Sequence, residues 1–532
     1  TIAPEQWEAL QLRNQLVAIE RLLTRIQPGD DIIPVLARLK GVRSPHNAYL
    51  QRDFGLFESR YAGLSPVERK YFNAFTGFIA REHWMAKIGE EGTDQAGSLA
   101  SLWRSSLDEK QQTFSILSHL EIADNHADQP DPFIIFRKTA ATNTLANFRA
   151  GDIAVLYPAF EPSDTVLQHQ VIKCTIVELN NESVKVHLRF QQFNLKPFDT
   201  QSLWHLEPDV MDMGFTAMYR SLFEWAGSDA QRRALVLAQR PPAMPLREVS
   251  GAGAATSAHN ALTEEQKVLF EKMIRSRDYF LLWGPPGTGK TSVMLRALAE
   301  WVLEQTTDNL LLLAYTNRAV DEICEALDSI GGSIRDQYLR IGSRFSTAED
   351  FHGQLLSRHT ADIHNRADLH ALLESRRIFV STVSSFAQND GLLRLKKFQR
   401  LVIDEASQIL EPQLAGLLTR FDHFILIGDH RQLPAVTTQR PQFTLVEDTD
   451  LHTIGLVDLR DSYFERLYRR CDQQEWHHAL GRLSAQGRMH RDIMEFPNQQ
   501  FYGNFLNTLS ADETDPQHLP LCYPRLPASP VW

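Results

Sequence analysis

The sequence predicts an α/β protein in which a parallel sheet between helices is joined to a small antiparallel β-barrel and a helical N-terminal region. Three observations lead to this prediction. From about residue 262, apolar runs alternate with helix-length segments, which is typical of a parallel sheet covered on both faces. Between residues 133 and 206, short β-branched stretches are separated by turn residues. Before residue 133, apolar residues recur with a helical period.

Residues 1–132 are expected to be helical. One apolar stripe recurs at steps of four and three and ends before a Pro-Gly pair, as helices commonly do. Its members are Leu12, Leu16, Ile19, Leu23 and Ile26. The stripe fits either an ordinary packed helix or a helix that binds a protein partner.

Residues 133–206 read as the barrel, with strand-like stretches such as FIIFRKT and SVKVHLRF. Residues 207–258 read as a stalk helix followed by a linker rich in Pro, Gly, Ala and Ser. Residues 259–475 contain the parallel-sheet domain, and residues 476–532 are expected to begin a second domain of the same kind. The sheet strands are expected at YFLLWG, LLLLAYT, RIFVSTV, RLVIDEA and HFILIGD.

The composition sets limits on compartment and partners. The 532 residues carry a net charge of −11, so a nucleic-acid groove would have to be locally basic on an acidic body. No run of about 18 apolar residues occurs and the N-terminus lacks signal-peptide features, which predicts no membrane contact and a cytoplasmic location, with the nucleus left open. The four cysteines are far apart, which favours buried thiols over zinc or redox motifs.

One glycine-rich loop carries the strongest signal for chemistry. GPPGTGKT fits the phosphate-binding pattern G-x-x-x-x-G-K-[ST] in full, between an apolar strand and a helix. Backbone N–H groups and the helix N-terminus would cradle phosphates, Lys290 would reach the β- and γ-phosphates, and Thr291 would hold Mg²⁺. The remaining loop positions expected to bind nucleotide are Gly284, Pro285, Gly287, Thr288 and Gly289.

A later strand supplies the acids that nucleotide hydrolysis requires. LVIDEASQ places Asp404 at the end of a buried strand, where it can join the Mg²⁺ shell. Glu405 beside it is placed to deprotonate the attacking water. Further along, Gln432 in GDHRQLP could sense a γ-phosphate, and Arg488 in QGRMH could clamp the same phosphate across a cleft.

The motifs GPPGTGKT, DEAS, GDxxQLP and QxRMH, in this order, resemble those of superfamily 1 helicases. The resemblance covers roughly residues 145–510 and points to the branch of the nonsense-mediated-decay RNA helicase and the nuclease-helicase of Okazaki-fragment processing. It implies a RecA-like P-loop motor domain, an accessory barrel over a nucleic-acid channel, and 5′ to 3′ movement on single strands.

The resemblance also implies residue roles. Gln266 would read the adenine edge, Gln432 would couple the γ-phosphate to the nucleic-acid site, and Arg488 would act from the second motor lobe. Single-stranded nucleic acid would be contacted at the ends of two strands, in AYTNRAVDEI and VSTVSS. The contacting residues there would be Thr316, Asn317, Ser381 and Thr382.

Two departures from the family pattern change the expectation. Gly487 stands where many relatives have a tyrosine that stacks on adenine, so base stacking is expected to be weaker or supplied elsewhere. The chain ends at Trp532, before the later motifs of the second lobe, so that this lobe is expected only in part. Taken alone, this chain is expected to bind ATP and Mg²⁺ but to hydrolyse ATP poorly.

The sequence therefore predicts an ATP-dependent helicase or translocase on single-stranded DNA or RNA, with a protein partner expected at the N-terminal helical region. Two alternatives stay open. One is an ATP-gated nucleic-acid clamp with little turnover. Slow ATP hydrolysis together with an ATP-dependent affinity for nucleic acid would favour it. The other is a hexameric AAA-type remodelling ATPase, which an oligomeric ring would favour.

Overall fold

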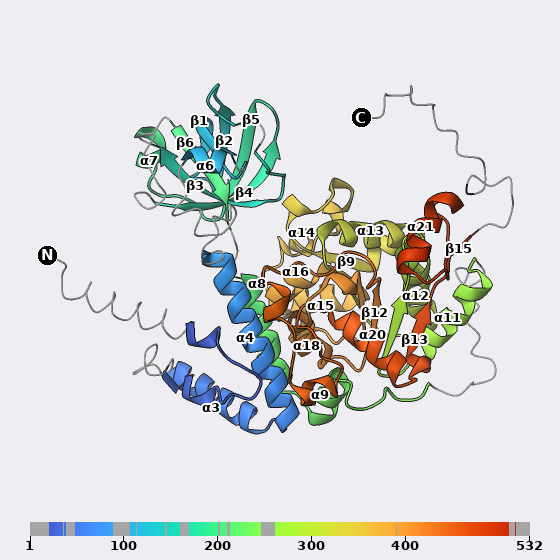
Figure 1. The fold of residues 1–532 in the computed structure, drawn as a ribbon. Coiled ribbons are helices and arrows are strands. Elements are labelled where there is room, and N and C mark those ends of the chain that lie inside the picture. Colours follow the sequence, from blue (N-terminus) through green and yellow to red (C-terminus); the bar gives the residue numbers. More distant parts are fainter. Residues whose placement is uncertain are drawn as a thin grey trace, which may run out of the picture.

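A computed structural model describes residues 21–35, 37–38, 48–88, 107–112, 114–143, 146–159, 170–200, 203–209, 213–245, 261–389, 391–509 and 517. An α/β domain forms the larger body, a barrel lies beside it, and long helices run between the two (Figure 1). The barrel also contacts the α/β domain directly, since the ring of His187 lies 4.9 Å, centroid to centroid, from that of Phe345.

The α/β domain is built on a seven-stranded sheet with the order β13-β7-β12-β11-β8-β10-β9, and every neighbouring pair is parallel. This sheet confirms the predicted fold class. Its strands are β7 (Tyr279–Trp283), β8 (Leu310–Ala314), β9 (Tyr338–Ile341), β10 (Ile378–Thr382), β11 (Arg400–Asp404), β12 (His423–Gly428) and β13 (Leu480–Arg482).

Both faces of this sheet are buried, which explains the unbroken apolar runs in its strands. Alternate side chains of β12 enter different cores: Ile425 and Ile427 join one, and Phe424 and Leu426 join the other. The first face is covered by α11 (Glu264–Arg275), α12 (Arg296–Gln305) and α13 (Asn317–Asp328). The second is covered by α15 (Arg366–Ser375), α16 (Val383–Gln388), α18 (Glu411–Leu418) and α20 (Tyr463–Gln473).

Six antiparallel strands close into the barrel in the order β1-β2-β5-β4-β3-β6, with β6 paired back to β1. They are β1 (Leu117–His126), β2 (Phe133–Lys138), β3 (Ile153–Ala159), β4 (Ile172–Leu179), β5 (Ser183–Leu188) and β6 (Leu203–Pro208). Short helices α6 (Leu107–Gln112) and α7 (Lys196–Thr200) accompany them. Alternating apolar residues fill the interior, and Trp204 is fully buried there beside Phe136 and Phe198.

Two helices form the stalk beneath the barrel: α4 (Pro66–Ile88) and α8 (Met213–Ala226). Tyr71 of α4 lies 4.9 Å, centroid to centroid, from Trp225 of α8. The α8 helix packs along α18, so the stalk shares a core with the sheet domain. Helices α3 (Ala48–Ala62) and α9 (Ala230–Val236) lie at the foot of the stalk (Figure 1).

Shorter elements complete the described chain. They are α14 (Leu356–Thr360), α17 (Leu392–Leu395), α19 (Thr449–His452), α21 (Arg491–Phe501), β14 (Ala485–Gln486) and β15 (Asn507–Thr508), the last two forming a small parallel pair.

The structure differs from the expected segment boundaries at two places. The barrel begins with β1 at Leu117 rather than at residue 133, because the polar stretch LSHLEIADNH gives little hydrophobic alternation. The short strand β13 lies within the range 476–532 but pairs with β7 of the first sheet. Of the N-terminal apolar stripe, Leu23 packs against the core and Ile26 is buried in it, whereas Leu12, Leu16 and Ile19 lie outside the described residues.

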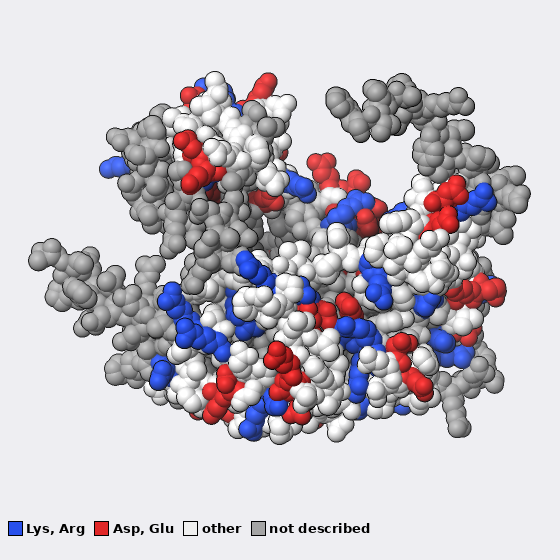
Figure 2. All heavy atoms as spheres, viewed as in Figure 1, with Lys and Arg blue, Asp and Glu red and all other residues white. Residues whose placement is uncertain are grey.

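No helix in the described ranges is long and apolar enough to cross a membrane. Cys174, Cys324 and Cys471 are buried free thiols, and Cys522 lies outside the described residues. On the face shown in Figure 2, basic and acidic side chains are interspersed over the sheet domain rather than gathered by sign.

Candidate nucleotide-binding site

The glycine-rich loop lies between the end of β7 and a π-helical turn (Lys290–Leu295) that leads into α12. At Gly287 the backbone has φ +78°, a left-handed conformation that favours glycine. At Gly284, an added Cβ would lie 2.4 Å from Cγ of Lys290, so that only glycine leaves room for the lysine. The loop sequence thus fixes a tight turn that holds Lys290 over it.

The predicted catalytic residues of β11 face this loop. The Lys290 ammonium lies 3.3 Å from Oε1 of Glu405, and the hydroxyl of Thr291 donates a 2.5 Å hydrogen bond to Oδ2 of Asp404. Asp404 ends β11, and Glu405 follows it with φ +52°, a left-handed conformation that is rare outside glycine. Four residues from two distant segments therefore meet at one point.

The electrostatics of this point are set by burial. Asp404 is almost fully buried, and this burial, together with the negative charge of Glu405, raises the pKa of the Asp404 carboxyl to about 6. The charge of Lys290 and the hydrogen bond from Thr291 act in the opposite direction. The carboxylate oxygens and the threonine hydroxyl are the hard ligands that Mg²⁺ takes. This donor set fits the expected magnesium ion.

Gln432 is held in place by a buried aspartate. Its side-chain amide donates a 2.9 Å hydrogen bond to Oδ2 of Asp429, the residue that directly follows β12. Asp429 also accepts hydrogen bonds from the indole of Trp283 at 2.8 Å and from the hydroxyl of Tyr502 at 2.8 Å. The carboxylate of Asp429 therefore ties Gln432 to the strand that precedes the phosphate loop.

The segment that carries Arg488 packs directly on the loop. The backbone N–H of Gly487 donates a 3.0 Å hydrogen bond to the carbonyl of Gly287, and a Cβ at Gly287 would lie 2.5 Å from Cβ of Arg488. The side chain of Gln486 is buried and accepts hydrogen bonds from the backbone N–H groups of Arg488 and Met489, which shapes this turn. Arg488 thus reaches the phosphate loop from a segment far along the chain.

These parts line one cleft of about 930 Å³. Gln266 borders it: it is buried, completes a capping box with Thr263 at the start of α11, and its amide lies 3.5 Å from the carbonyl of Thr288. The predicted residues that line the cleft are Gln266, Pro285, Gly287, Thr288, Gly289, Lys290, Thr291, Glu405, Gln432 and Arg488. Gly284 and Asp404 lie directly behind this lining, and Asp404 is bonded to Thr291.

The four residues predicted to contact nucleic acid lie apart from the cleft, at the carboxyl ends of β8 and β10. Thr316 is exposed and its hydroxyl caps α13, whose first residue is the half-buried Asn317. Ser381 is fully buried and donates to the carbonyl of Ile341 at 3.1 Å, and the buried Thr382 caps α16. The serine and threonine hydroxyls are therefore used within the fold, and their contact with nucleic acid stays a prediction.

Several residues of the site, among them Asp429, Arg318 and Glu322, were given no role from the sequence. Asp429 holds Gln432, and Arg318 and Glu322 of α13 line the same cleft. Asp429 is part of the GDHRQLP motif, so its position shortly before Gln432 could have indicated that the two side chains interact. The two α13 residues gave none, because only the tertiary packing of α13 brings them to the loop.

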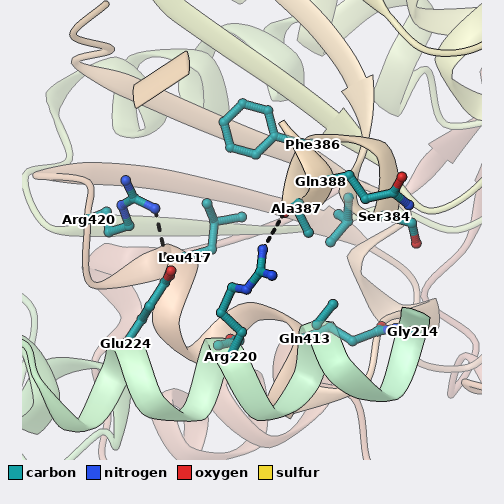
Figure 3. Close-up of a pocket in the computed structure, with 13 residues that line it drawn as sticks. Gly214, Arg220, Glu224, Ser384, Phe386, Ala387, Gln388, Gln413, Leu417 and Arg420 are labelled. Carbon is teal, nitrogen blue, oxygen red and sulfur yellow. Dashed lines mark hydrogen bonds and ion pairs between the residues drawn. The ribbon is translucent and has the colours of Figure 1, made fainter. Parts of the chain in front are cut away.

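A second, smaller cavity of about 250 Å³ lies between α8, α16 and α18 (Figure 3). Arg220 and Glu224 point into it from α8, where Arg220 donates to the carbonyl of Ala387 at 3.4 Å and Glu224 pairs with Arg420 at 3.7 Å. Its walls include none of the predicted nucleotide residues. This cavity marks the joint between stalk and sheet domain.

Comparison with known proteins identifies family models and relatives that this chain resembles. Two models described as AAA domain match residues 261–492 and 459–527. The DNA replication ATP-dependent helicase/nuclease JHS1 of Arabidopsis thaliana is 29% identical over 59% of this chain and 22% of its own length. The helicase/nuclease DNA2 of Gallus gallus is 29% identical over 47% of this chain and 23% of its own length. An uncharacterized ATP-dependent helicase of Methanocaldococcus jannaschii is 25% identical over 57% of this chain and 53% of its own length.

A phosphate loop after β7 that faces an Asp-Glu pair at the end of β11 defines a P-loop nucleoside triphosphatase. The matched relatives, which are helicases, narrow this class further. These matches support a superfamily 1 helicase of the branch that contains these helicase/nucleases. The chain spans about a fifth of the length of the two helicase/nucleases.

Proposed function

We propose that this chain is the motor portion of an ATP-dependent helicase or translocase that moves along single-stranded nucleic acid, in the 5′ to 3′ direction. The observation that carries the proposal is the meeting of Lys290 and Thr291 with Asp404 and Glu405, closed on the opposite side by the Arg488 segment. Hydrolysis between two elements that can open and close is how a motor converts ATP into movement.

Each side chain has a role that its position supports. Lys290 binds the terminal phosphates, and Thr291 with Asp404 would hold Mg²⁺, which would neutralise phosphate charge and orient the reacting group. Glu405 accepts the proton of the attacking water. Arg488 stabilises the charge that develops on the transferred phosphoryl group. Gln432, held by Asp429, reports the γ-phosphate to the rest of the motor.

The track is proposed to run over the carboxyl edge of the sheet, past Thr316 and Asn317 and under the barrel. We infer DNA as the first polymer to test, because two relatives are named as DNA replication helicase/nucleases. Buried thiols and a nucleic-acid substrate favour an intracellular location, and the N-terminal helices are the proposed site for a protein partner.

Two alternatives predict different behaviour. A nucleic-acid clamp would bind DNA or RNA in an ATP-dependent manner with little turnover. A remodelling ATPase would assemble into a ring; the description AAA domain fits it as well as a helicase, but the matched helicase relatives favour a translocating motor.

The test measures ATP hydrolysis with no polymer, with single-stranded DNA and with single-stranded RNA, using Glu405→Gln as the blank. Strong stimulation by either polymer supports the motor and identifies its track. Intact ATP binding without stimulation would contradict it: ATP-dependent polymer affinity would then indicate the clamp, and a ring in light scattering would indicate the remodeller.

A further inference from the structure

The stalk helices are locked to each other near the barrel. The α8 helix begins at Met213, soon after β6 of the barrel ends at Pro208. The ring of His83, near the end of α4, stacks on Phe215 at the start of α8, with 4.7 Å between the centroids. This contact links α4 to α8, which follows barrel strand β6 in the chain.

Glu82, the residue before His83, is hydrogen-bonded to the sheet domain. Glu82 is buried, and both of its carboxylate oxygens accept hydrogen bonds from residues 438 and 439 of the sheet domain. The backbone N–H and hydroxyl of Thr438 donate to it at 2.9 and 2.8 Å, and the backbone N–H and side-chain amide of Gln439 donate at 2.8 and 2.9 Å. We refer to Glu82, Thr438 and Gln439 as the stalk clamp.

A second side chain of α4 reinforces the stalk clamp. Arg81 donates to the side-chain oxygen of Gln439 at 2.7 Å, while the amide nitrogen of Gln439 also donates to the carbonyl of Phe78 at 3.0 Å. All polar atoms of the Gln439 side chain are thus used by α4. Because a buried carboxylate that loses its partners is strongly destabilised, α4 and residues 438–439 are held together when either moves.

The clamped segment leads straight back to the nucleotide site. Gln432, which lines the cleft, precedes Thr438 by a short stretch that contains Pro434, whose backbone φ is fixed by its ring. Two residues of this stretch, Leu433 and Val436, are more than four-fifths exposed, whereas Ala435 between them is buried in the core that the sheet domain shares with the stalk helices. A shift of Gln432 can therefore pass along the stretch to the stalk clamp.

We propose that Glu82 is a positioning residue that couples nucleotide state at Gln432 to the orientation of the barrel, and through it to the grip on nucleic acid. This inference rests on the proposed function. By thermodynamic reciprocity, ATP changes the affinity for nucleic acid by the same factor by which nucleic acid changes the affinity for ATP. Glu82 is required for that factor, not for the hydrolysis step.

The experiment compares the full protein with Glu82→Gln, which keeps the shape of the side chain but removes its charge and one acceptor oxygen. The affinity for a fluorescent oligothymidylate is measured with a non-hydrolysable ATP analogue and with ADP, and the ratio is the coupling factor. Coupling of this kind is typically about 5- to 150-fold. In Glu82→Gln we expect this factor to fall towards one, with unchanged basal ATPase rate and KM for ATP.

Two further variants test the interpretation: one weakens the stalk clamp, and the other is a control on the same helix. Thr438→Val removes one hydrogen bond to Glu82 and is expected to lower the coupling factor less, in the same direction. Lys70→Ala removes ion pairs at 2.8 Å between the same helix and Asp448 and Asp450, at a more exposed site, and is expected to leave the coupling factor unchanged.

The outcomes separate the two proposals. An unchanged coupling factor in Glu82→Gln overturns the role of the stalk clamp, and so does a fall in basal ATPase that matches the fall in coupling, since that pattern indicates a structural role. Wild-type protein that binds no oligonucleotide in any nucleotide state overturns the proposed function together with this inference.

Discussion

Glu405 adopts a left-handed backbone conformation directly after a buried strand, at φ +52°. Such conformations cost free energy in residues other than glycine and persist only where the surroundings impose them. Here the conformation turns the carboxylate towards the Lys290 ammonium, at 3.3 Å. The backbone of this single residue therefore directs the group that is proposed to activate water.

Replacing Glu405 with glutamine should separate binding from hydrolysis. We expect Glu405→Gln to keep the affinity for ATP and to lower kcat about 100-fold or more, because general bases typically contribute at least that factor. Steady-state ATPase and fluorescent-nucleotide binding measure the two effects. Glu322→Gln, a change on the rim of the same cleft, serves as the control and should leave kcat unchanged. Normal turnover in Glu405→Gln would assign the base elsewhere.

The Asp404 carboxyl gives a pH prediction. Its pKa is raised to about 6, so in the free protein it takes up a proton as the pH falls through 6 and loses the charge that holds Mg²⁺. We expect kcat/KM for Mg·ATP to fall below about pH 6, because this parameter reports groups of the free enzyme. A profile that stays flat down to pH 5 would contradict the assignment.

The same carboxyl predicts the opposite trend for stability without nucleotide. The folded protein binds this proton more tightly than the unfolded chain, whose aspartates have their ordinary pKa. The contribution of Asp404 to the free energy of unfolding therefore decreases as the pH rises from about 4 to about 6. Asp404→Asn removes the titrating group, and denaturant melts at the two pH values should show a smaller difference than in the wild type.

Among the elements, α8 and α18 approach each other unusually closely. A Cβ at Gly416 of α18 would lie 2.2 Å from the carbonyl oxygen of Ser221 on α8, and the Gly416 N–H donates a 2.9 Å hydrogen bond to the hydroxyl of Ser221. Since α18 follows Asp404 and Glu405 in the chain, this contact fixes the stalk to the catalytic strand.

Gly416→Ala should push these helices apart. Overpacking of this kind typically costs about 1–3 kcal/mol, and we expect the free energy of unfolding to fall by about that amount. Chemical denaturation measures it. Gly214→Ala, on α8 itself, meets open space and should be neutral or slightly stabilising. Equal stability of both variants would show that the helices can separate without cost.

At the scale of the whole molecule, an acidic chain is proposed to bind a polyanion. The net charge is −11, and charges of both signs are mixed on the face in Figure 2. Binding must therefore depend on local contacts with phosphates, in which counterions are released. The affinity for nucleic acid should therefore fall steeply as the salt concentration rises. Its source would be these local contacts, because the net charge of the protein repels a polyanion.

Salt titration checks this statement. For about 6–10 phosphate contacts, we expect affinity for a single-stranded oligonucleotide to fall by about 300-fold to about 15,000-fold between about 50 and 200 mM salt. An uncharged peptide nucleic acid of the same base sequence is the control and should bind weakly, with little salt dependence. Affinity for DNA that does not change with salt would contradict a backbone-held track.

Local sequence was enough for the α/β class, the barrel and the phosphate loop. Unbroken apolar runs predicted strands whose side chains are buried on both faces of the sheet. The loop motif predicted its own turn and the strand and helix on either side of it. Strands with weak local patterns were not predictable. Polar β1 and three-residue β13 exist because they pair with β6 and β7, respectively, which are contacts between segments far apart in the chain.

The sequence by itself determined that Lys290 and Thr291 end a phosphate loop and that Asp404 and Glu405 end a strand, because each pattern is written in neighbouring residues. Only the tertiary structure decided that Arg488 packs on Gly287, that Asp429 holds Gln432, and that Ser381 is buried. It also decided the stalk clamp, which joins residues 82 and 438. The physical reason is that side chains distant in sequence meet only when helices and strands pack, and no local pattern records which of them will do so.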